Sequence, residues 1–342
     1  MKILVVGAGF SGATIARLLA INGFHVDVIE KRNHVAGNAF DFINEYGIRI
    51  HQYGPHLFHT SNMKVVEFLS EFTKWTDYKH KVKAQLKNGQ FVTLPVNIET
   101  QEIVGKENVL DIFFRPYTKK MWGLDIEQLD PEILSRLPVR DDKNEMYFPN
   151  DSFQAMPSDG YTGLIQKMLT HENICTYLDT VFYKKESSNY LHTFNSMPID
   201  EYFDFRHGHL PYRSIKFHNF TIPSPQIYPV ATVNFTHSEK FTRVTEWKNL
   251  PNHGSNDAYT SLTFEEPCDY VDNNFERYYP IKDIDGKNRL TYNKYLQDKE
   301  SNMSFIGRCG LYAYLDMHQA VSSSMKIAMD FISSYRFNHP TY

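Results

Sequence analysis

Residues 2–12 read Lys-Ile-Leu-Val-Val-Gly-Ala-Gly-Phe-Ser-Gly, a short hydrophobic run that ends abruptly in a glycine-rich turn. The spacing of Gly7, Gly9 and Gly12 is the G-x-G-x-x-G fingerprint of dinucleotide-binding domains. In this motif Gly7 lets the strand turn, Gly9 lets the backbone approach a pyrophosphate, and Gly12 lets the next helix pack closely. We expect the pyrophosphate at the positive N-terminus of a helix that starts near Ser11.

The following residues complete a strand–helix–strand pattern. We expect a helix over residues 13–22, a stop at Gly23 and a strand over residues 24–30. Glu30 ends that strand about 20 residues past the glycines, where such domains place the acid that binds a ribose hydroxyl. A buried βαβ unit without a ligand is the alternative interpretation.

The bulk composition narrows the function classes. The chain has 342 residues, 42% of them hydrophobic and 22% charged, which is typical of a soluble globular protein with two or three domains. With 40 acidic and 36 basic residues the net charge is −4, and no basic block occurs, so nucleic acid and membranes are not expected partners. We see no signal peptide and no apolar run near about 18 residues.

Cysteine usage also favours a cytoplasmic protein without a structural metal. Cys175, Cys268 and Cys309 are far apart and odd in number, so they form neither a disulfide framework nor a zinc spacing. His56 and His59 lack a third ligand in register, so we expect no metal.

Several polar segments are candidates for contacts with a cofactor. Residues 31–38 would form a second tight turn beside the nucleotide, where Arg32 could reach its phosphates or simply lie exposed. His56 and His59 follow a Gly-Pro break. They could contact the reactive ring of the cofactor or be hydrogen-bonded structural residues.

The middle of the chain predicts mixed elements. Residues 61–75 suggest an amphipathic helix capped by Ser61, and residues 80–96 a hairpin that turns at Asn88. Residues 113–123 interleave aromatic and basic side chains, which suits a nucleobase with phosphates. The alternative for that block is a helix with a buried aromatic face.

Arginines beside aromatic residues predict a site for a diphosphate. Arg136 and Arg140 precede Tyr147 and Phe148, and guanidinium groups bind oxyanions in a fork. A solvated loop is the alternative. Arg243 lies in a β-prone strand, where it is either paired with an acid such as Glu246 or aimed at a ligand.

The last segments extend both expected domains. Residues 215–279 hold β-rich runs between Pro, Asn and Gly breaks, which indicates an antiparallel sheet. A short strand at residues 305–306, followed by Gly307 and Arg308, and a helix that continues through residue 332 return to the nucleotide domain. The N-terminus of this helix could stabilise negative charge on a reduced flavin.

From residue 1 to about residue 332 the chain resembles the bacterial-type UDP-galactopyranose mutases. Seven ordered motifs carry the resemblance: Gly7 to Gly12, Tyr53 to Thr60, Tyr117 to Gly123, Arg136 to Arg140, Phe241 to Arg243, Tyr278 to Ile281, and Gly307-Arg308 with Tyr314 to Met317.

The resemblance implies an α/β plus β fold: a Rossmann-like FAD-binding domain, a substrate domain with a six-stranded antiparallel sheet, and a reduced helical insert. We assign residues 1–78, 158–205 and 297–342 to the FAD domain, residues 98–135 to the helical segment, and residues 79–97, 136–157 and 206–296 to the sheet domain.

The resemblance also implies an isomerase that interconverts UDP-galactopyranose and UDP-galactofuranose for cell-surface polysaccharide biosynthesis. In that family N5 of reduced FAD attacks the anomeric carbon as UDP leaves, which is covalent catalysis by the cofactor. The implied partners are a UDP-sugar and a reductant, NAD(P)H or a reductase. The alternatives are a mutase for UDP-N-acetylgalactosamine or a dTDP-deoxysugar, an amine-oxidase-like flavoenzyme, and a nucleotide-sugar-binding protein without activity.

The resemblance assigns roles residue by residue. Arg136 and Arg243 would clamp the diphosphate, with His56 and His59 beside the flavin. Residues that would contact the substrate are Phe113, Tyr117, Trp122, Tyr147, Phe148, Tyr279 and Tyr314. Residues that would bind FAD are Gly7, Gly9, Phe10, Ser11, Gly12, Glu30, Lys31, Gly37, Asn38, His56, Arg308, Tyr314, Asp316 and Met317.

The chain departs from the family pattern in three places. Only residues 98–112 stand where the family has a helical insert of several tens of residues, which puts the usual dimer contact in question. Ala36 replaces a usual glycine. Cys309 and Ala313 differ near the expected flavin.

Overall fold

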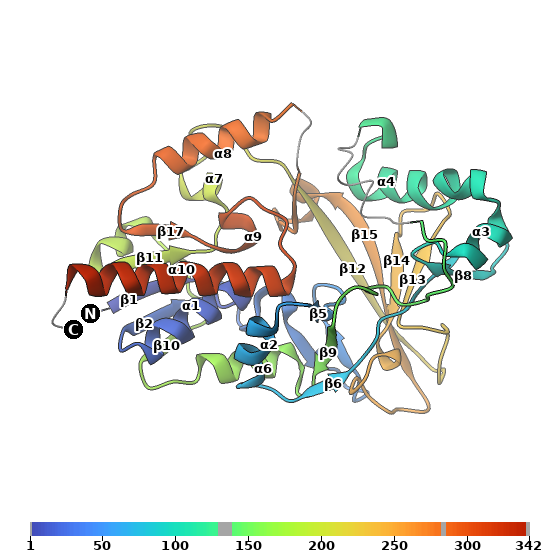
Figure 1. Ribbon diagram of the computed structural model, residues 1–342, viewed down its shortest axis with the longest axis horizontal. Helices are drawn as coiled ribbons and strands as arrows, with labels where there is room; N and C mark the ends of the chain where they lie inside the picture. Colours follow the sequence, from blue (N-terminus) through green and yellow to red (C-terminus); the bar gives the residue numbers. More distant parts are fainter. Residues whose placement is uncertain (1, 129–138, 282–284, 340–342) are drawn as a thin grey trace.

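The computed structural model describes residues 2–128, 139–281 and 285–339 (Figure 1). Arg136 lies outside these residues. A five-stranded sheet at the left of Figure 1 has the order β10-β2-β1-β11-β17, and every neighbouring pair is parallel. Its strands are β1 (Lys2–Val6), β2 (His25–Ile29), β10 (Ile174–Tyr177), β11 (His192–Asn195) and β17 (Met303–Phe305). This sheet confirms the expected Rossmann-like architecture.

Alternate residues of β1 face opposite sides of the parallel sheet. Ile3 and Val5 pack in the main core against the helices on one face, while Leu4 and Val6 join a smaller cluster on the other. A strand buried on both faces reads as a continuous hydrophobic run, as this one does. The helices on the main-core face are α1 (Phe10–Ile21), α2 (Met63–Ser70), α6 (Gly160–Leu169) and α10 (Met317–Asn338).

A second sheet of seven strands lies beside the first, at the right of Figure 1. Its order is β16-β12-β15-β14-β13-β7-β8. The expectation of six antiparallel strands is therefore wrong: the sheet has seven strands, and one pair, β13 with β7, is parallel. This pair is where the hairpin at residues 80–96 joins the sheet. Its strands are β7 (Val82–Gln85), β8 (Phe91–Leu94), β12 (Tyr212–Ile222), β13 (Thr232–Phe235), β14 (Arg243–Glu246), β15 (Thr260–Asp269) and β16 (Tyr279–Pro280).

Two small sheets and short helices complete the described chain. The strand β9 (Phe153–Pro157), from a segment that we assigned to the substrate sheet, pairs instead with β5 (Phe58–Thr60) and β6 (Trp75–Asp77). The remaining elements are β3 (Asp41–Ile43), β4 (Arg49–His51), η1 (Gly37–Ala39), α3 (Ile98–Val104), η2 (Lys106–Asn108), η3 (Leu110–Phe114), α4 (Arg115–Trp122), η4 (Ile126–Gln128), η5 (Lys184–Asn189), α7 (Ile199–Tyr202), η6 (Trp247–Asn249), η7 (Tyr270–Asn273), α8 (Lys287–Gln297) and α9 (Gly307–Gly310).

The predicted helix at residues 61–75 is shorter than expected. It spans Met63–Ser70, and Asn62 precedes it as the N-cap residue. The expected cap, Ser61, instead donates its hydroxyl to the carbonyl of Asn150 at 3.3 Å. The chain after this helix is drawn into β6 by pairing with β9, which ends the helical pattern early.

Close backbone packing places α1 on β1. A Cβ atom added at Gly12 would lie 1.8 Å from the carbonyl oxygen of Gly7, so only glycine fits there. Gly7 itself has φ of +101°, a conformation that other residues rarely adopt. The two glycines therefore determine how near the helix N-terminus comes to the end of the strand.

Four histidines are buried in the described structure. The exposed fraction is 0% for His51, 4% for His80, 9% for His192 and 3% for His253. Burial lowers the pKa of His80 to about 3, and that of His192 and His253 to about 4. Burial also lowers the pKa of His51. All four are therefore neutral in the folded protein at pH 7.

We predict that Gly12→Ala destabilises the protein by roughly 2–3 kcal/mol or more, because the new methyl group overlaps a backbone carbonyl that cannot move alone. The measurement is urea unfolding. Gly163→Ala in α6 is the control: its Cβ would meet only the Cβ of Asp159, at 3.2 Å. That variant should stay within about 1 kcal/mol of the wild type. Equal losses in both variants would refute the packing argument.

We also predict that the free energy of unfolding falls as the pH drops from about 6.5 toward 4. The unfolded histidines titrate near pH 6.5, so below that pH the unfolded chain binds protons that the folded chain refuses. Each such histidine contributes about 1.4 kcal/mol per pH unit to this slope. Urea unfolding between pH 7 and 5 measures it. In the variant His192→Gln, the slope of unfolding free energy against pH should be smaller by the contribution of one histidine. An unchanged slope would contradict the conclusion that His192 is neutral in the folded protein.

Candidate active site

A cavity of about 620 Å³ lies where the domain of the parallel sheet and the seven-stranded sheet meet. This volume is within the usual range for small-molecule sites. The cavity collects side chains that are far apart in the sequence. Predicted site residues that line it are Asn38, His56, His59, Tyr117, Trp122, Tyr147, Phe148, Arg243, Tyr279, Arg308, Tyr314, Asp316 and Met317.

Arg243 lies on the sheet wall of the cavity, opposite an acid. In the register of the sheet it is flanked by Asn234 on β13 and Glu265 on β15. Its Nε donates to Oε2 of Glu265 at 2.7 Å, and Glu265 is only 1% exposed. The pairing with Glu246 considered from the sequence is wrong, because that carboxylate accepts the backbone N–H groups of Ile227 and Tyr228.

The electrostatics keep Arg243 charged. Burial, the largest single effect, lowers the pKa of the Arg243 guanidinium, but Glu265 together with Tyr117 and Tyr279 raises it more, so the net shift of the Arg243 pKa is upward. Its two Nη groups make no hydrogen bond to the described part of the chain. They are thus available to an oxyanion in the cavity, and a guanidinium fork suits a phosphate.

A second arginine lies under a pair of tyrosines. Arg308 donates to the carbonyl of Tyr278 at 2.9 Å and to that of Leu315 at 2.6 Å. Its guanidinium lies 5.3 Å from the ring centre of Tyr279 and 4.9 Å from that of Tyr314. The two tyrosine rings stack 5.7 Å apart with an interplanar angle of 14°. The arginine therefore fixes the orientation of both rings at the cavity wall.

The two predicted histidines have different surroundings. The Nδ1 of His56 lies 2.8 Å from the carbonyl of Gly54, and burial lowers the pKa of His56 to about 4. The Nδ1 of His59 lies 2.6 Å from Oδ2 of Asp151, and its ring stacks on Phe148 at 3.5 Å. His56 is therefore neutral at pH 7, while His59 is held by a carboxylate and a stacked ring.

Tyrosine and tryptophan side chains also line the cavity. Burial raises the pKa of Tyr117 and Tyr147, and raises that of Tyr279 to about 12. At neutral pH these phenols keep their protons and can donate hydrogen bonds to phosphate or sugar oxygens. Trp122 meets Tyr279 edge to face at 6.5 Å.

Phe113 is not at the cavity, in contrast to the expectation. It is 8% exposed and packs with Phe114 in a hydrophobic cluster below the hairpin of β7 and β8. The turn from Leu110 to Phe114 is a π-helix, which shifts the register of the aromatic residues relative to a regular α-helix. The alternative of a buried aromatic face therefore holds for Phe113 and Phe114. Arg136 lies outside the described residues.

The glycine motif lies at the N-terminus of α1, next to Gly37. Gly9 is the N-cap residue of this helix, and within the described part of the chain no side chain caps the helix end. An added Cβ at Gly37 would lie 3.1 Å from Cα of Gly9, so two glycines face each other there. The uncapped amides of the first turn suit a pyrophosphate. The Phe10 ring packs on Tyr161 and Ser11 is buried, so they can offer backbone groups.

Glu30 and its neighbours lie at the end of β2. The two carboxylate oxygens of Glu30 accept the backbone N–H groups of Ala8 and Arg32, both at 3.0 Å. Each oxygen keeps a lone pair for a ribose hydroxyl. Lys31 is exposed. Ala36, which replaces a usual glycine, has φ of +72°, a left-handed conformation that favours glycine.

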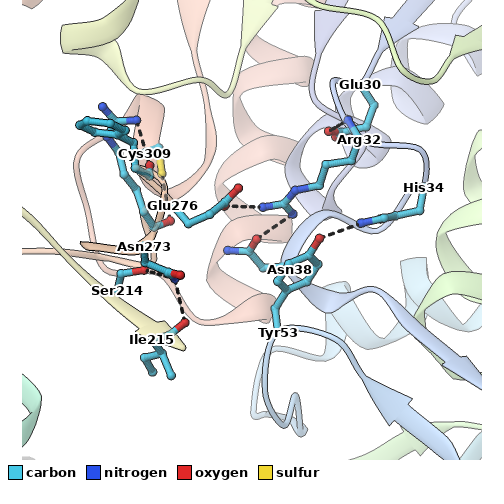
Figure 2. Close-up of polar contacts among 12 residues, drawn as sticks. Glu30, Arg32, His34, Asn38, Tyr53, Ser214, Ile215, Asn273, Glu276 and Cys309 are labelled. Carbon is cyan, nitrogen blue, oxygen red and sulfur yellow. Dashed lines mark hydrogen bonds and ion pairs between the residues drawn. The ribbon is translucent and has the colours of Figure 1, made fainter. Parts of the chain in front are cut away.

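Arg32 is neither exposed nor free for phosphates; it ties the two domains together (Figure 2). It donates to Oδ1 of Asn38 at 3.0 Å and to Oε2 of Glu276 at 2.9 Å. Its guanidinium lies 4.3 Å from the ring centre of Tyr53, whose hydroxyl meets His34. The loop that carries Glu276 is anchored by Asn273, which bonds to Ser214 and Ile215 on β12 (Figure 2).

The N-terminus of α10 borders the cavity. Asp316 is the N-cap residue of this 22-residue helix, and its backbone N–H donates to Oε1 of Gln319 at 2.9 Å. Asp316, Met317 and Gln319 all line the cavity. The positive end of the helix dipole therefore points at the space where a ligand would lie.

Some cavity residues were missed from the sequence. Glu265 falls in the β-rich region and could have been found as an acid at a buried position of an alternating strand. Tyr53, His80, Phe217 and Tyr278 also line the cavity. Tyr53 and Tyr278 begin two of the motifs that carry the family resemblance, whereas no local pattern distinguishes His80 and Phe217. They reach it through strand pairing and loop packing.

No helix in the described ranges combines the length and the apolar character that a membrane span requires. No group of three or more His, Cys, Asp or Glu side chains within those ranges could hold a metal ion.

Comparisons with known proteins agree with the geometry. A model of the UDP-galactopyranose mutase family matches residues 112–314, and one of NAD(P)-binding Rossmann-like domains matches residues 5–72. The chain is 34% identical to a probable UDP-galactopyranose mutase of Klebsiella pneumoniae, covering 97% of this chain and 95% of that protein. It is also 34% identical to a dTDP-fucopyranose mutase of Escherichia coli, covering 97% and 99%.

Solved structures show the same fold. A structure of reduced UDP-galactopyranose mutase superposes with a TM-score of 0.76 at 16% identity, covering 97% of this chain and 94% of the other. A putrescine oxidase with bound putrescine gives a TM-score of 0.59 at 13% identity, covering 97% and 99%. At these identities the structures establish the fold only, whereas the family model and the curated relatives go further: the chain belongs to the UDP-galactopyranose mutase family.

Proposed function

We propose that the protein is a flavin-dependent mutase that interconverts the pyranose and furanose forms of a nucleotide sugar, with UDP-galactose as the first candidate. The observation that carries this proposal is the position of Arg243. A charged arginine, whose two Nη groups have no hydrogen-bond partner among the described residues, lines the same cavity as Asn38, which follows the glycine that faces Gly9. An oxidase of amines needs no such diphosphate-binding group.

FAD is the cofactor of this family, and the residues present fit it. The uncapped N-terminus of α1 suits the pyrophosphate, and Glu30 suits the adenosine ribose. Toward the cavity, Asn38, His56, Arg308 and Met317 would surround the isoalloxazine ring. When bound and reduced, the flavin supplies the nucleophile, and the protein supplies position and charge.

The protein's own groups bind and orient the substrate. Arg243, held by Glu265, would bind the diphosphate and keep the released nucleotide diphosphate next to the sugar. Tyr147, Tyr279 and Tyr314 would donate hydrogen bonds to phosphate and sugar oxygens, and Tyr117 and Trp122 would pack on the base or sugar. We propose Arg136 as the second diphosphate ligand, from the family resemblance.

Two nucleotide sugars are candidates for the substrate. The Klebsiella pneumoniae and Escherichia coli relatives are equally similar to this chain at 34%, although their names give different nucleotide sugars. A dTDP-fucopyranose substrate is therefore the second candidate. For either sugar the flavin needs a reductant, for which we propose NAD(P)H or a reductase.

We predict activity only with reduced flavin. The holoenzyme is reduced with dithionite and incubated in one reaction with UDP-galactofuranose and in another with dTDP-fucofuranose. The pyranose product of each reaction is measured by chromatography. Conversion of one nucleotide sugar in the reduced state supports the mutase and names the substrate. Oxygen consumption with an amine would instead indicate an oxidase, and tight UDP binding without turnover a binding protein.

We further predict that Arg243→Ala and Arg136→Ala each lose most of the turnover, by roughly 100-fold or more, while FAD stays bound. The loss follows because the diphosphate is no longer held at the reacting carbon. Turnover and the flavin absorption spectrum are measured together. The control is Arg206→Ala, which removes an exposed arginine that is paired with Asp298. Near-normal turnover in either cavity variant would exclude the clamp role.

A further inference from the structure

Two buried histidines, His253 and His51, form a chain of hydrogen bonds that ends at the backbone of His56, a residue that lines the cavity. The Nδ1 of His253 lies 2.8 Å from the carbonyl of Pro251, and its Nε2 lies 3.0 Å from Nε2 of His51. The Nδ1 of His51 lies 3.1 Å from the backbone nitrogen of His56. None of these three contacts is to solvent, because His51 and His253 are 0% and 3% exposed.

The chemistry of the partners determines where each proton lies. A carbonyl oxygen only accepts, so Nδ1 of His253 must carry its proton, and its Nε2 is then the acceptor. His51 must therefore donate from Nε2 and accept at Nδ1, which is what the backbone N–H of His56 requires. All the donors and acceptors along the chain match with neutral rings.

The same reasoning extends to the His56 ring. Its Nδ1 faces the carbonyl of Gly54 and must donate, so Nε2 carries a lone pair. This Nε2 makes no hydrogen bond to the described residues, and His56 lines the cavity. The ring therefore presents an acceptor to the ligand, which suits a hydroxyl or N–H donor.

This chain of hydrogen bonds from His253 through His51 to His56, which we call the relay, also joins the seven-stranded sheet to the loop that carries His56. His253 lies in the loop that follows β14, the strand of Arg243, and its carbonyl accepts the backbone N–H of Arg49 on β4. Its ring is parallel to that of Trp247, with the centres 6.2 Å apart. The loop backbone comes so close that a Cβ at Gly254 would lie 2.8 Å from the carbonyl of Gly47.

We propose that His253 and His51 are positioning residues: they hold the backbone of His56, so that its ring, with the Nδ1 proton fixed by the Gly54 carbonyl, faces the substrate and cofactor as a hydrogen-bond acceptor. The expected effect on turnover rests on the proposed function, whereas the hydrogen bonds and tautomers do not. Removing the acceptor at His253 leaves a buried N–H on His51 without a partner, which costs free energy unless His51 changes tautomer. That change would in turn remove the acceptor for the His56 amide and shift the loop.

The first test is direct and needs no turnover. The ¹⁵N spectra of histidine-labelled holoenzyme at pH 7 report the tautomer of each ring. We expect the Nδ1–H form for His56 and His253 and the Nε2–H form for His51. A charged ring, or an Nε2–H form for His56, would overturn the proposal whether or not the protein proves to be a mutase.

The second test separates a hydrogen-bonding role from a packing role. His253→Gln keeps an acceptor near Nε2, whereas His253→Phe keeps the ring next to Trp247 and removes the acceptor. We expect the Phe variant to lose roughly 10- to 100-fold in kcat with KM within about threefold, and the Gln variant to keep kcat within about threefold. Equal activities, or a more active Phe variant, would refute the relay.

His192→Phe is the matched control for this series. This substitution also removes a buried histidine with a side-chain partner, since Nε2 of His192 lies 2.9 Å from the hydroxyl of Ser304. His192, however, lies in the parallel sheet and does not line the cavity. The kcat of this variant should equal that of the wild type. If His253→Phe does not fold, the Gln variant and its ¹⁵N spectrum still decide, because a changed His56 tautomer there contradicts the proposal. A wild-type holoenzyme without turnover would refute the proposed function and leave the tautomer test intact.

Discussion

The contact of Gly12 with the carbonyl of Gly7 is the constraint on which most of the molecule depends. It brings α1 down onto β1, and α10 then packs along α1. The N-terminus of α10 is thereby placed at the edge of the cavity together with Arg308 and Tyr314. A larger residue at position 12 would move the helix, and with it one wall of the site.

The opposite wall depends on the balance of buried charge. Arg243 can remain on the sheet face because Glu265, itself buried, neutralises it from the neighbouring strand. A buried ion pair of this kind adds little net stability, since desolvation offsets the attraction. Its contribution is orientation: the pair engages Nε and leaves the fork of the guanidinium for an oxyanion.

The short helical segment is held by backbone carbonyls rather than by a larger helical domain. Lys120 of α4 donates to the carbonyls of Phe235, His237 and Phe241 at the turn between β13 and β14. Arg213 of β12 donates to the carbonyl of Met121, which follows Lys120 in the last turn of the same helix. The alignment with the Klebsiella pneumoniae relative runs over 371 residues, more than the 342 of this chain, so that relative contains residues that are absent here. The contacts of Lys120 and Arg213 support the helix that carries Tyr117 and Trp122.

The sequence by itself determined the dinucleotide motif, the β1–α1–β2 unit, the β7–β8 hairpin and the family, because these depend on local spacing and ordered motifs. Only the tertiary structure decided which acid faces Arg243, that Phe113 is core, and that Arg32 bridges to Glu276. It also decided the hydrogen-bond chain from His253 to His56. These facts depend on strand register, on a π-helical turn and on loops separated by up to 244 positions, and no local pattern encodes such pairings.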